Sequence, residues 1–171
     1  MFAFIIIVLI LLLLAFFVLK VKSAGGSDFP YQKAKALFSP AERSFLGVID
    51  QAVGTEFRVF GKVRIADVAT VKTMPNRSAW QKAFNRISSK HFDFIICRSS
   101  DLSIVCVVEL NDKSHQKKSR KLRDEFVAGV CNSISVPLVE INTQASYSIQ
   151  ELKERFNEIL NPPALELKKS A

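Results

Sequence analysis

The feature that most constrains this chain is an unbroken run of 18 apolar residues, Phe2 to Leu19, close to its start. As an α-helix the run would extend roughly 27 Å, which nearly spans the roughly 30 Å hydrocarbon core of a bilayer. The alternatives are a buried core helix and a secretory signal peptide. A signal peptide begins with basic residues and ends at small ones, whereas this start lacks Lys and Arg, and Lys22 occupies a position that should be small. The run therefore predicts a transmembrane anchor over residues 1–20.

The residues that flank the apolar run predict its orientation. Lys20, Lys22, Lys33 and Lys35 all follow it, and basic residues beside a membrane span stay in the cytoplasm. We therefore expect a single-pass protein of the inner (cytoplasmic) membrane, with the domain that follows the anchor in the cytoplasm.

The cysteines and histidines indicate neither disulfides nor zinc. Cys97, Cys106 and Cys131 are odd in number and lie in apolar segments without a CxxC pair, so we expect reduced, packed side chains. His91 and His115 form no zinc-binding pattern.

The net charge of +8 belongs entirely to the sequence after Leu19. A stretch of roughly 150 residues can form one domain with its own core. A basic domain beside a membrane meets two polyanions, nucleic acid and anionic lipid, and charge alone does not choose between them.

Helix and loop signals divide this stretch further. Residues 21–38 contain Gly-Gly and a Pro and read as a polar tether, and residues 161–171 read as a tail. The domain between them, residues 39–160, opens with a helix signal in which Ser39 caps, Pro40 follows and Glu42 completes a capping box.

Apolar periodicity predicts the elements of the domain. They are helix 39–54, strand 57–65, a short helix over 76–88 that packs Trp80, Phe84 and Ile87, strands 91–97 and 103–110, helix 117–134, strand 136–141 and helix 148–160. This order indicates an α/β fold with a mixed sheet flanked by helices on both faces. Strands 91–97, 103–110 and 136–141 are apolar on both sides, which is typical of central strands.

Two acids stand in the strands that the five-residue turn "RSSDL" joins. Asp93 lies near the start of the first strand and Glu109 at the end of the second. In an antiparallel hairpin these positions meet at the same edge of the sheet, so the two carboxylates would lie close enough to share a ligand. Such a pair suits Mg²⁺ or Mn²⁺, which take oxygen ligands. The alternative is an acid pair neutralised by Arg86, Lys90 or Arg123.

Several blocks of this sequence, from about residue 37 to about residue 142, resemble the bacterial "domain of unknown function 2726" family. The blocks are "LFSPAERSFLGVI", "RISSKHFDFIIC", "VVELNDKSH", "RKLRDEF" and "VPLVEI". That family is similar to the restriction-endonuclease-like, or PD-(D/E)XK, nucleases, whose core order is αβββαβ. The resemblance implies that Asp93, Glu109 and Glu42 are the metal-binding acids. For Glu42 a capping role alone is an equal alternative.

The nuclease pattern carries Lys two residues after the third-strand acid, where this chain has Asn111. Lys would position the attacking water and offset charge on the phosphate, and Asn brings no charge. Lys113, His115 or Lys117, in the loop that follows, could replace it. For His115 the alternative is a solvated loop residue.

A basic run, "KSHQKKSRKLRD", follows the acid edge directly. It can contact nucleic-acid phosphates, or it can be an ordinary solvated helix face. The residues concerned are Lys117, Lys118, Arg120, Lys121 and Arg123. No exposed aromatic platform for single strands is evident in the sequence.

Together these features predict a membrane-anchored, nuclease-like protein that hydrolyses phosphodiester bonds of DNA or RNA with Mg²⁺ or Mn²⁺. The alternative is a catalytically inactive module of the same fold that binds nucleic acid, anionic lipid or a protein partner.

Overall fold

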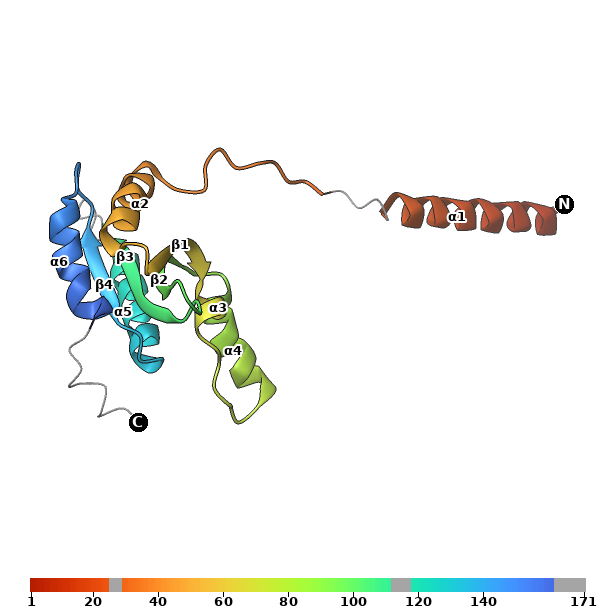
Figure 1. Ribbon diagram of the computed structural model, residues 1–171. Coiled ribbons are helices and arrows are strands. Elements are labelled where there is room, and N and C mark those ends of the chain that lie inside the picture. The colour runs from red at the N-terminus through yellow and green to blue at the C-terminus, as the bar shows by residue number, and fades with distance from the viewer. Residues whose placement is uncertain (25–28, 112–117, 162–171) are drawn as a thin grey trace. The chain divides into compact units, whose positions relative to one another are not determined.

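The computed structural model describes the backbone of residues 1–24, 29–111 and 118–161, with all side chains in these ranges except residues 3, 21–24 and 118–120 (Figure 1). The chain divides into two compact units, Met1–Leu37 and Phe38–Ala171.

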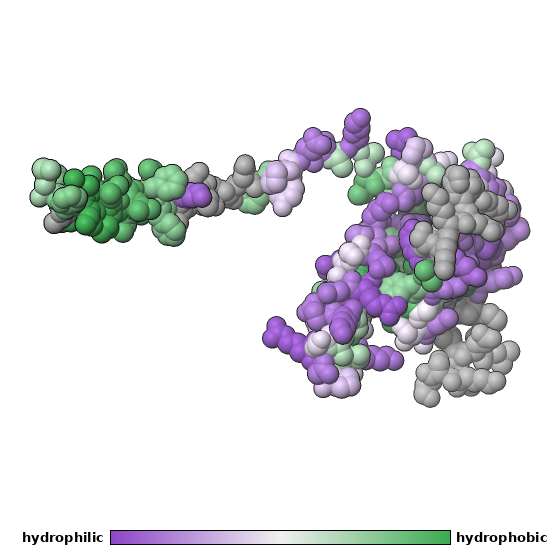
Figure 2. Space-filling view, turned by 180° about the vertical axis from the view of Figure 1, so that it is seen from behind, coloured by the Kyte–Doolittle hydropathy of each residue, from purple (hydrophilic) through white to green (hydrophobic). Residues whose placement is uncertain are grey.

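The first unit contains helix α1 (Phe2–Ala24), which includes the whole apolar run. Its described side chains are exposed, and Figure 2 shows α1 as a largely hydrophobic surface. Counting only the residues that the structure describes, no helix reaches the combination of length and apolarity that crossing a membrane requires.

The second unit is a mixed α/β domain built on a four-stranded sheet (Figure 1). Its elements are α2 (Pro40–Val53), β1 (Phe57–Arg64), α3 (Ile65–Val68), α4 (Arg77–Ser88), β2 (His91–Arg98), β3 (Ile104–Asn111), α5 (Lys118–Ser133), β4 (Leu138–Asn142) and α6 (Ile149–Leu160). The predicted order of helices and strands is confirmed. Residues 65–68, which the sequence left unassigned, form the short helix α3.

The strands lie in the order β1-β2-β3-β4, and only β3 and β4 are parallel. The long connection through α5 permits that parallel pairing. The prediction that residues 136–141 form a central strand is wrong, because β4 is at the edge of the sheet, where exposed Glu140 and Asn142 alternate with buried Val139 and Ile141.

Each face of the sheet carries its own hydrophobic core. On one face α2 and α6 pack against the sheet with fully buried Phe45 and Phe156. On the other face α3, α4 and α5 contribute Ile65, Ile87 and Val127. The sheet is therefore covered on both sides, and the two cores keep its strand ends in register.

The predicted capping box of α2 is present. The backbone N–H of Ser39 donates to Glu42 Oε2 at 2.7 Å, and the backbone N–H of Glu42 donates to Ser39 Oγ at 3.3 Å. These bonds satisfy amide groups that a helix start leaves without partners.

The three cysteines of the chain are free and buried, as expected. Burial raises the pKa of the Cys106 thiol to about 12 and that of Cys131 to about 11. Both thiols therefore stay protonated and unreactive near neutral pH.

Candidate metal centre

The two acids lie where the central strands part. The ladder between β2 and β3 ends at the Phe94–Val108 pair, whereas β2 stays paired with β1 as far as His91 and β3 with β4 as far as Asn111. Asp93 and Glu109 occupy the next position on each strand. We call this place the fork.

Both carboxylates replace missing rungs of the ladder at the fork. The backbone N–H of Asp93 donates to Glu109 Oε1 at 3.1 Å, and the backbone N–H of Leu110 donates to Asp93 Oδ2 at 3.0 Å. Backbone amides inside a protein need acceptors, and each acid supplies one to the opposite strand. One oxygen of each carboxylate is therefore fixed, which orients the other.

The two remaining oxygens converge on one guanidinium group from α5. Arg123 Nη2 lies 3.3 Å from Glu109 Oε2 and 3.6 Å from Asp93 Oδ1. The side chain of Glu109 is 9% exposed and that of Asp93 is 13% exposed, whereas that of Arg123 is 48% exposed. A half-solvated arginine thus faces two nearly buried acids. The predicted closeness of Asp93 and Glu109 is confirmed, and Arg123 is the basic partner among the three considered.

This arginine does not fully compensate the pair. Burial, together with the nearby charge of Asp93, raises the pKa of Glu109 to about 7. Desolvation and a like charge both disfavour an ionised carboxylate. The fold therefore favours the protonated, uncharged form of Glu109 up to about pH 7.

Glu42 has a different partner. Lys62 Nζ lies 2.5 Å from Glu42 Oε1, and the other oxygen accepts the capping bond from Ser39. Burial raises the pKa of Glu42, but the hydrogen bonds from Lys62 and Ser39 outweigh it, so the net shift is downward. Among the described residues no three His, Cys, Asp or Glu side chains are grouped closely enough to hold a metal. The structure thus unites Asp93 and Glu109 without Glu42.

Lys62 also marks a distortion in β1 opposite Asp93. The ladder pairs Gly61 with Phe94 and Val63 with Phe92, and Lys62 has a φ of 57°. A positive φ is uncommon for a residue with a side chain. The distortion therefore lies within β1 itself, directly after Gly61.

Asn111 bonds away from the acid pair. Its side-chain amide donates to Glu140 Oε1 on β4 at 3.2 Å, and its backbone carbonyl oxygen accepts the backbone N–H of Thr143 at 2.9 Å. The position at which the nuclease pattern carries Lys is thus tied to the neighbouring strand.

Comparison with known proteins adds one result. The model of a family described as "Protein of unknown function (DUF2726)" matches residues 34–159. The chain belongs to this family. The match includes every element from α2 to β4, nearly all of α6, and the whole fork. No curated protein and no solved structure matches the chain significantly.

Some predicted residues of the DUF2726 domain cannot be compared with the structure. Lys113, His115 and Lys117 lie outside the described residues, and the side chains of Lys118 and Arg120 do too. Lys121 is exposed on α5 and lies 3.9 Å from Glu125. The role of the basic run in phosphate binding stays a prediction.

The sequence indicated Arg86 and Lys90 only as possible partners of the acid pair. The guanidinium carbon of Arg86 and Nζ of Lys90 lie 4.9 Å and 5.0 Å from the centre of the Phe126 ring. Phe126 follows Arg123 by three residues, and therefore by about one turn, on α5. No sequence pattern indicated that the Phe126 ring of α5 would contact one cation from α4 and another from the loop that follows α4.

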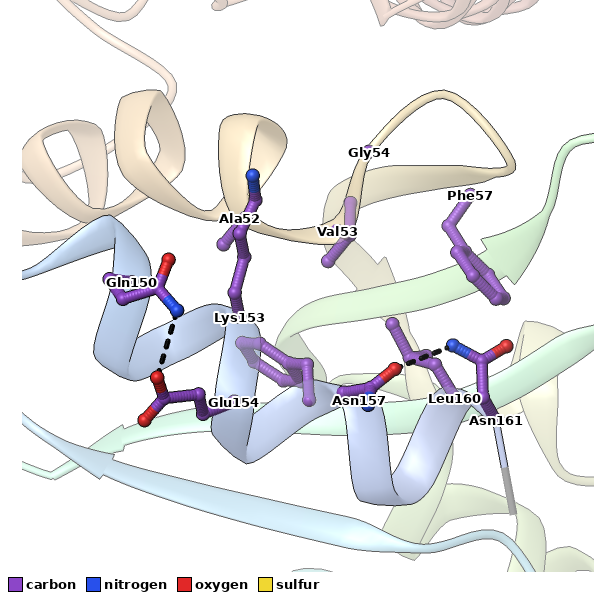
Figure 3. A pocket seen from close by; sticks show the side chains of 11 residues that line it. Ala52, Val53, Gly54, Phe57, Gln150, Lys153, Glu154, Asn157, Leu160 and Asn161 are labelled. Carbon is purple, nitrogen blue, oxygen red and sulfur yellow. Dashed lines mark hydrogen bonds between the residues drawn. The ribbon is translucent and has the colours of Figure 1, made fainter. Parts of the chain in front are cut away.

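A separate hollow lies between α2 and α6, on the face of the sheet opposite α5 (Figure 3). Its volume is about 370 Å³, and apolar side chains such as Val53 and Phe57 line it. On its polar side Gln150 bonds Glu154 and Asn161 bonds Asn157, so these groups satisfy each other (Figure 3). The hollow contains neither acid of the fork.

Proposed function

We propose that the DUF2726 domain is a metal-dependent, nuclease-like hydrolase of phosphodiester bonds in nucleic acid, related to the PD-(D/E)XK nucleases. The observation that supports this most is the convergence of Asp93 Oδ1 and Glu109 Oε2 on one cation position at the fork.

The fork fits a hard divalent cation. Both converging oxygens are carboxylate oxygens, which Mg²⁺ and Mn²⁺ prefer, and Mg²⁺ typically takes one or two carboxylates and completes its shell with water. The raised pKa of Glu109, caused first by burial and then by Asp93, means that ionising this carboxylate is costly, and a bound cation would reduce that cost. Asp93 and Glu109 would hold the ion. When bound, it would activate water and stabilise charge on the phosphate.

The surrounding side chains supply cations for a phosphate backbone. Arg123 is half-exposed, so it can leave the acids and donate to phosphate oxygens instead. Arg86 and Lys90 add two positive charges over the ring of Phe126, which lies about one helical turn from Arg123. Such contacts are independent of base sequence.

The test is a cleavage assay with the full chain, on single-stranded and duplex DNA and RNA, in Mg²⁺, Mn²⁺ or EDTA. We expect cleavage that requires the metal and is lost in Asp93→Asn and Glu109→Gln. The matched control is Glu125→Gln, which removes an exposed carboxylate of α5 that contacts only Lys121 among the described ion pairs. Absence of both cleavage and metal-dependent stabilisation would overturn the proposal.

A second candidate function is a binding module that has lost catalysis, and two observations favour it. Arg123 already contacts both acids, and Asn111 is bonded to Glu140 instead of facing the fork. Asn111→Lys restores the Lys of the nuclease pattern, but the new side chain would meet the same Glu140 carboxylate. Asn111→Lys should therefore leave cleavage unchanged or raise it, and the Asn111→Lys/Glu140→Gln double variant should raise it further. Failure of both variants to cleave would favour the binding module.

We also propose that α1 anchors the chain in the cytoplasmic membrane, with the DUF2726 domain in the cytoplasm. The support comes first from the full sequence, whose 18-residue apolar run includes one position, residue 3, with a side chain outside the described ones. The exposed apolar side chains of α1 and the lysines that follow agree with it. The full chain should resist carbonate extraction, and a reporter at its C-terminus should be active in the cytoplasm. A processed chain outside the cell would contradict the proposal.

A further inference from the structure

Helix α4 presents an aromatic pair outside the two cores. Asn76 caps the helix by accepting the backbone N–H of Ala79 at 2.9 Å. Trp80 and Phe84 stack in parallel, with ring centres 5.1 Å apart and planes 8° apart. Trp80 is 39% exposed, and neither ring is part of the two hydrophobic clusters. The helix that was predicted to pack Trp80 leaves that ring partly exposed outside both cores, so an aromatic face that was not evident in the sequence is accessible.

The sequence around this pair is basic throughout. Residues 68–92 contain no Asp or Glu, and the stretch is mostly hydrophilic at the surface (lower left of the domain in Figure 2). It carries Lys72, Arg77, Lys82, Arg86 and Lys90. Within the part of the chain that the structure describes, none of the ion pairs involves these five cations. The segment that holds the aromatic pair is therefore positively charged, and positive charge attracts a polyanion.

This basic stretch is continuous with the fork. Arg86 lies in the last turn of α4 and Lys90 precedes β2, and both lie over Phe126. Phe126 is three residues from Arg123, which contacts the acids. Positive groups thus lead from α4 to Asp93 and Glu109 without an intervening acid on α4 or the loops beside it.

We propose that Trp80, backed by Phe84, stacks on a base of single-stranded nucleic acid whose phosphates follow Arg86 and Lys90 toward the fork. The inference rests on the proposed function and names its substrate class. A single strand is favoured because only unstacked bases offer their faces to an aromatic side chain, and such stacking is tolerant of sequence.

The rival occupant is an anionic lipid surface, since Trp, Lys and Arg also suit membrane interfaces. A helix that lies in an interface needs a broad apolar face. In α4 Trp80 is the only large apolar side chain that is strongly exposed, and Gln81 and Asn85 bond each other at 2.8 Å on its surface. These features favour stacking on a base over insertion into lipid.

Trp80 is the only tryptophan of the chain, so its emission reports directly on the platform. The experiment uses the full chain in nanodiscs of zwitterionic lipid, with EDTA to prevent cleavage. We expect a single-stranded oligothymidylate or oligouridylate to quench Trp80 emission, and a duplex of equal length to quench it less. Quenching should weaken as salt rises, because phosphate contacts release counterions.

Binding of a labelled oligonucleotide, measured by fluorescence anisotropy, tests the residue itself. Trp80→Ala should weaken binding about 5- to 100-fold, the range expected for loss of one stacked base, and Trp80→Phe should weaken it much less. The control is Leu102→Ala, which removes a 54% exposed apolar side chain at the opposite end of the β2–β3 hairpin. It should bind like the wild type.

Unchanged binding by Trp80→Ala would overturn the inference. So would a change in Trp80 emission that appears only when phosphatidylglycerol is added to the nanodiscs, because it would assign the platform to lipid. Failure of the proposed function looks different. If the chain binds single strands through Trp80 but never cleaves them, the stacking role of Trp80 stands and the proposed nuclease activity fails. If Trp80→Ala cleaves with unchanged KM, the stacking role fails and the nuclease activity stands.

Discussion

At the scale of single residues, Glu109 contributes to the fold in two opposing ways. Its Oε1 closes the β2–β3 ladder by accepting the backbone N–H of Asp93, while its charge lies nearly buried beside a second acid. A protein that kept Glu109 only for stability would do better with a neutral acceptor. The cost of the charge is what a bound cation would relieve.

The pH dependence of stability measures that cost. The pKa of Glu109 rises from about 4.5 in the unfolded chain to about 7 in the fold. The folded state therefore binds the Glu109 proton more tightly than the unfolded chain does. The stability that this proton contributes to the fold is fully present below about pH 4.5 and is lost as pH rises through about 7. In EDTA, urea unfolding should show Glu109→Gln gaining stability relative to wild type between about pH 5 and about pH 8, by at most about 3 kcal/mol.

The comparison has a built-in control. Glu125→Gln, at an exposed position, should track the wild type across the same pH range. Destabilisation of Glu109→Gln at every pH would mean that the ion pair with Arg123 stabilises the fold more than burial of the charge costs it.

Glu42 provides the second test at this scale. Glu42→Gln keeps one acceptor oxygen for the capping bond but loses the pairing with Lys62, so we expect a loss of about 1 kcal/mol in the free energy of unfolding. Its thermal shift with Mg²⁺ or Mn²⁺ should equal that of the wild type, while Asp93→Asn should lose the shift. A smaller thermal shift in Glu42→Gln than in the wild type would indicate that Glu42 takes part in metal binding.

At the scale of elements, the junction between the tether and the sheet depends on one glycine. The Phe38 ring stacks on Phe94 at 5.7 Å and occupies the space where a side chain at Gly61 would lie. Gly61→Ala should displace that ring and cost about 1–3 kcal/mol, measured by chemical unfolding. Gly47→Ala, on an open face of α2, is the control and should stabilise by roughly 0.5–1 kcal/mol. Equal effects of both substitutions would show that Phe38 is not held against β1.

The elements also show how far sequence patterns reach. Asp93 and Glu109 could be placed together because hairpin register follows from two strands and a short turn. The edge position of β4 could not, because an apolar run reads alike in a central and an edge strand. Trp80 was misplaced for a similar reason, since a helical stripe of apolar residues does not reveal where the core beneath it ends. The sequence could not predict that Arg123, and not Lys90 or Arg86, pairs with the two acids, because that depends on how α5 packs.

At the scale of the whole molecule, the chain joins an apolar helix to a basic domain that is complete in its packing. Every residue of the two hydrophobic clusters lies between Phe38 and Leu160. The DUF2726 match begins at residue 34, close to the same boundary. The proposed membrane attachment and the proposed metal binding at the fork can therefore be tested separately, because each belongs to its own segment of sequence.

Deleting residues 2–19 tests that separation. Because no member of either core is removed, the shortened chain should unfold at the same temperature as the DUF2726 domain of the full chain, within about 2 °C, and should give the same circular dichroism. It should also move from the membrane fraction to the soluble fraction and keep its metal-dependent thermal shift, since Asp93, Glu109 and Arg123 remain. A lower unfolding temperature or a lost thermal shift would show that α1 supports the domain itself. The matched control replaces four apolar residues of α1 by lysine at unchanged chain length, which should release the protein from the membrane with the same unaltered fold.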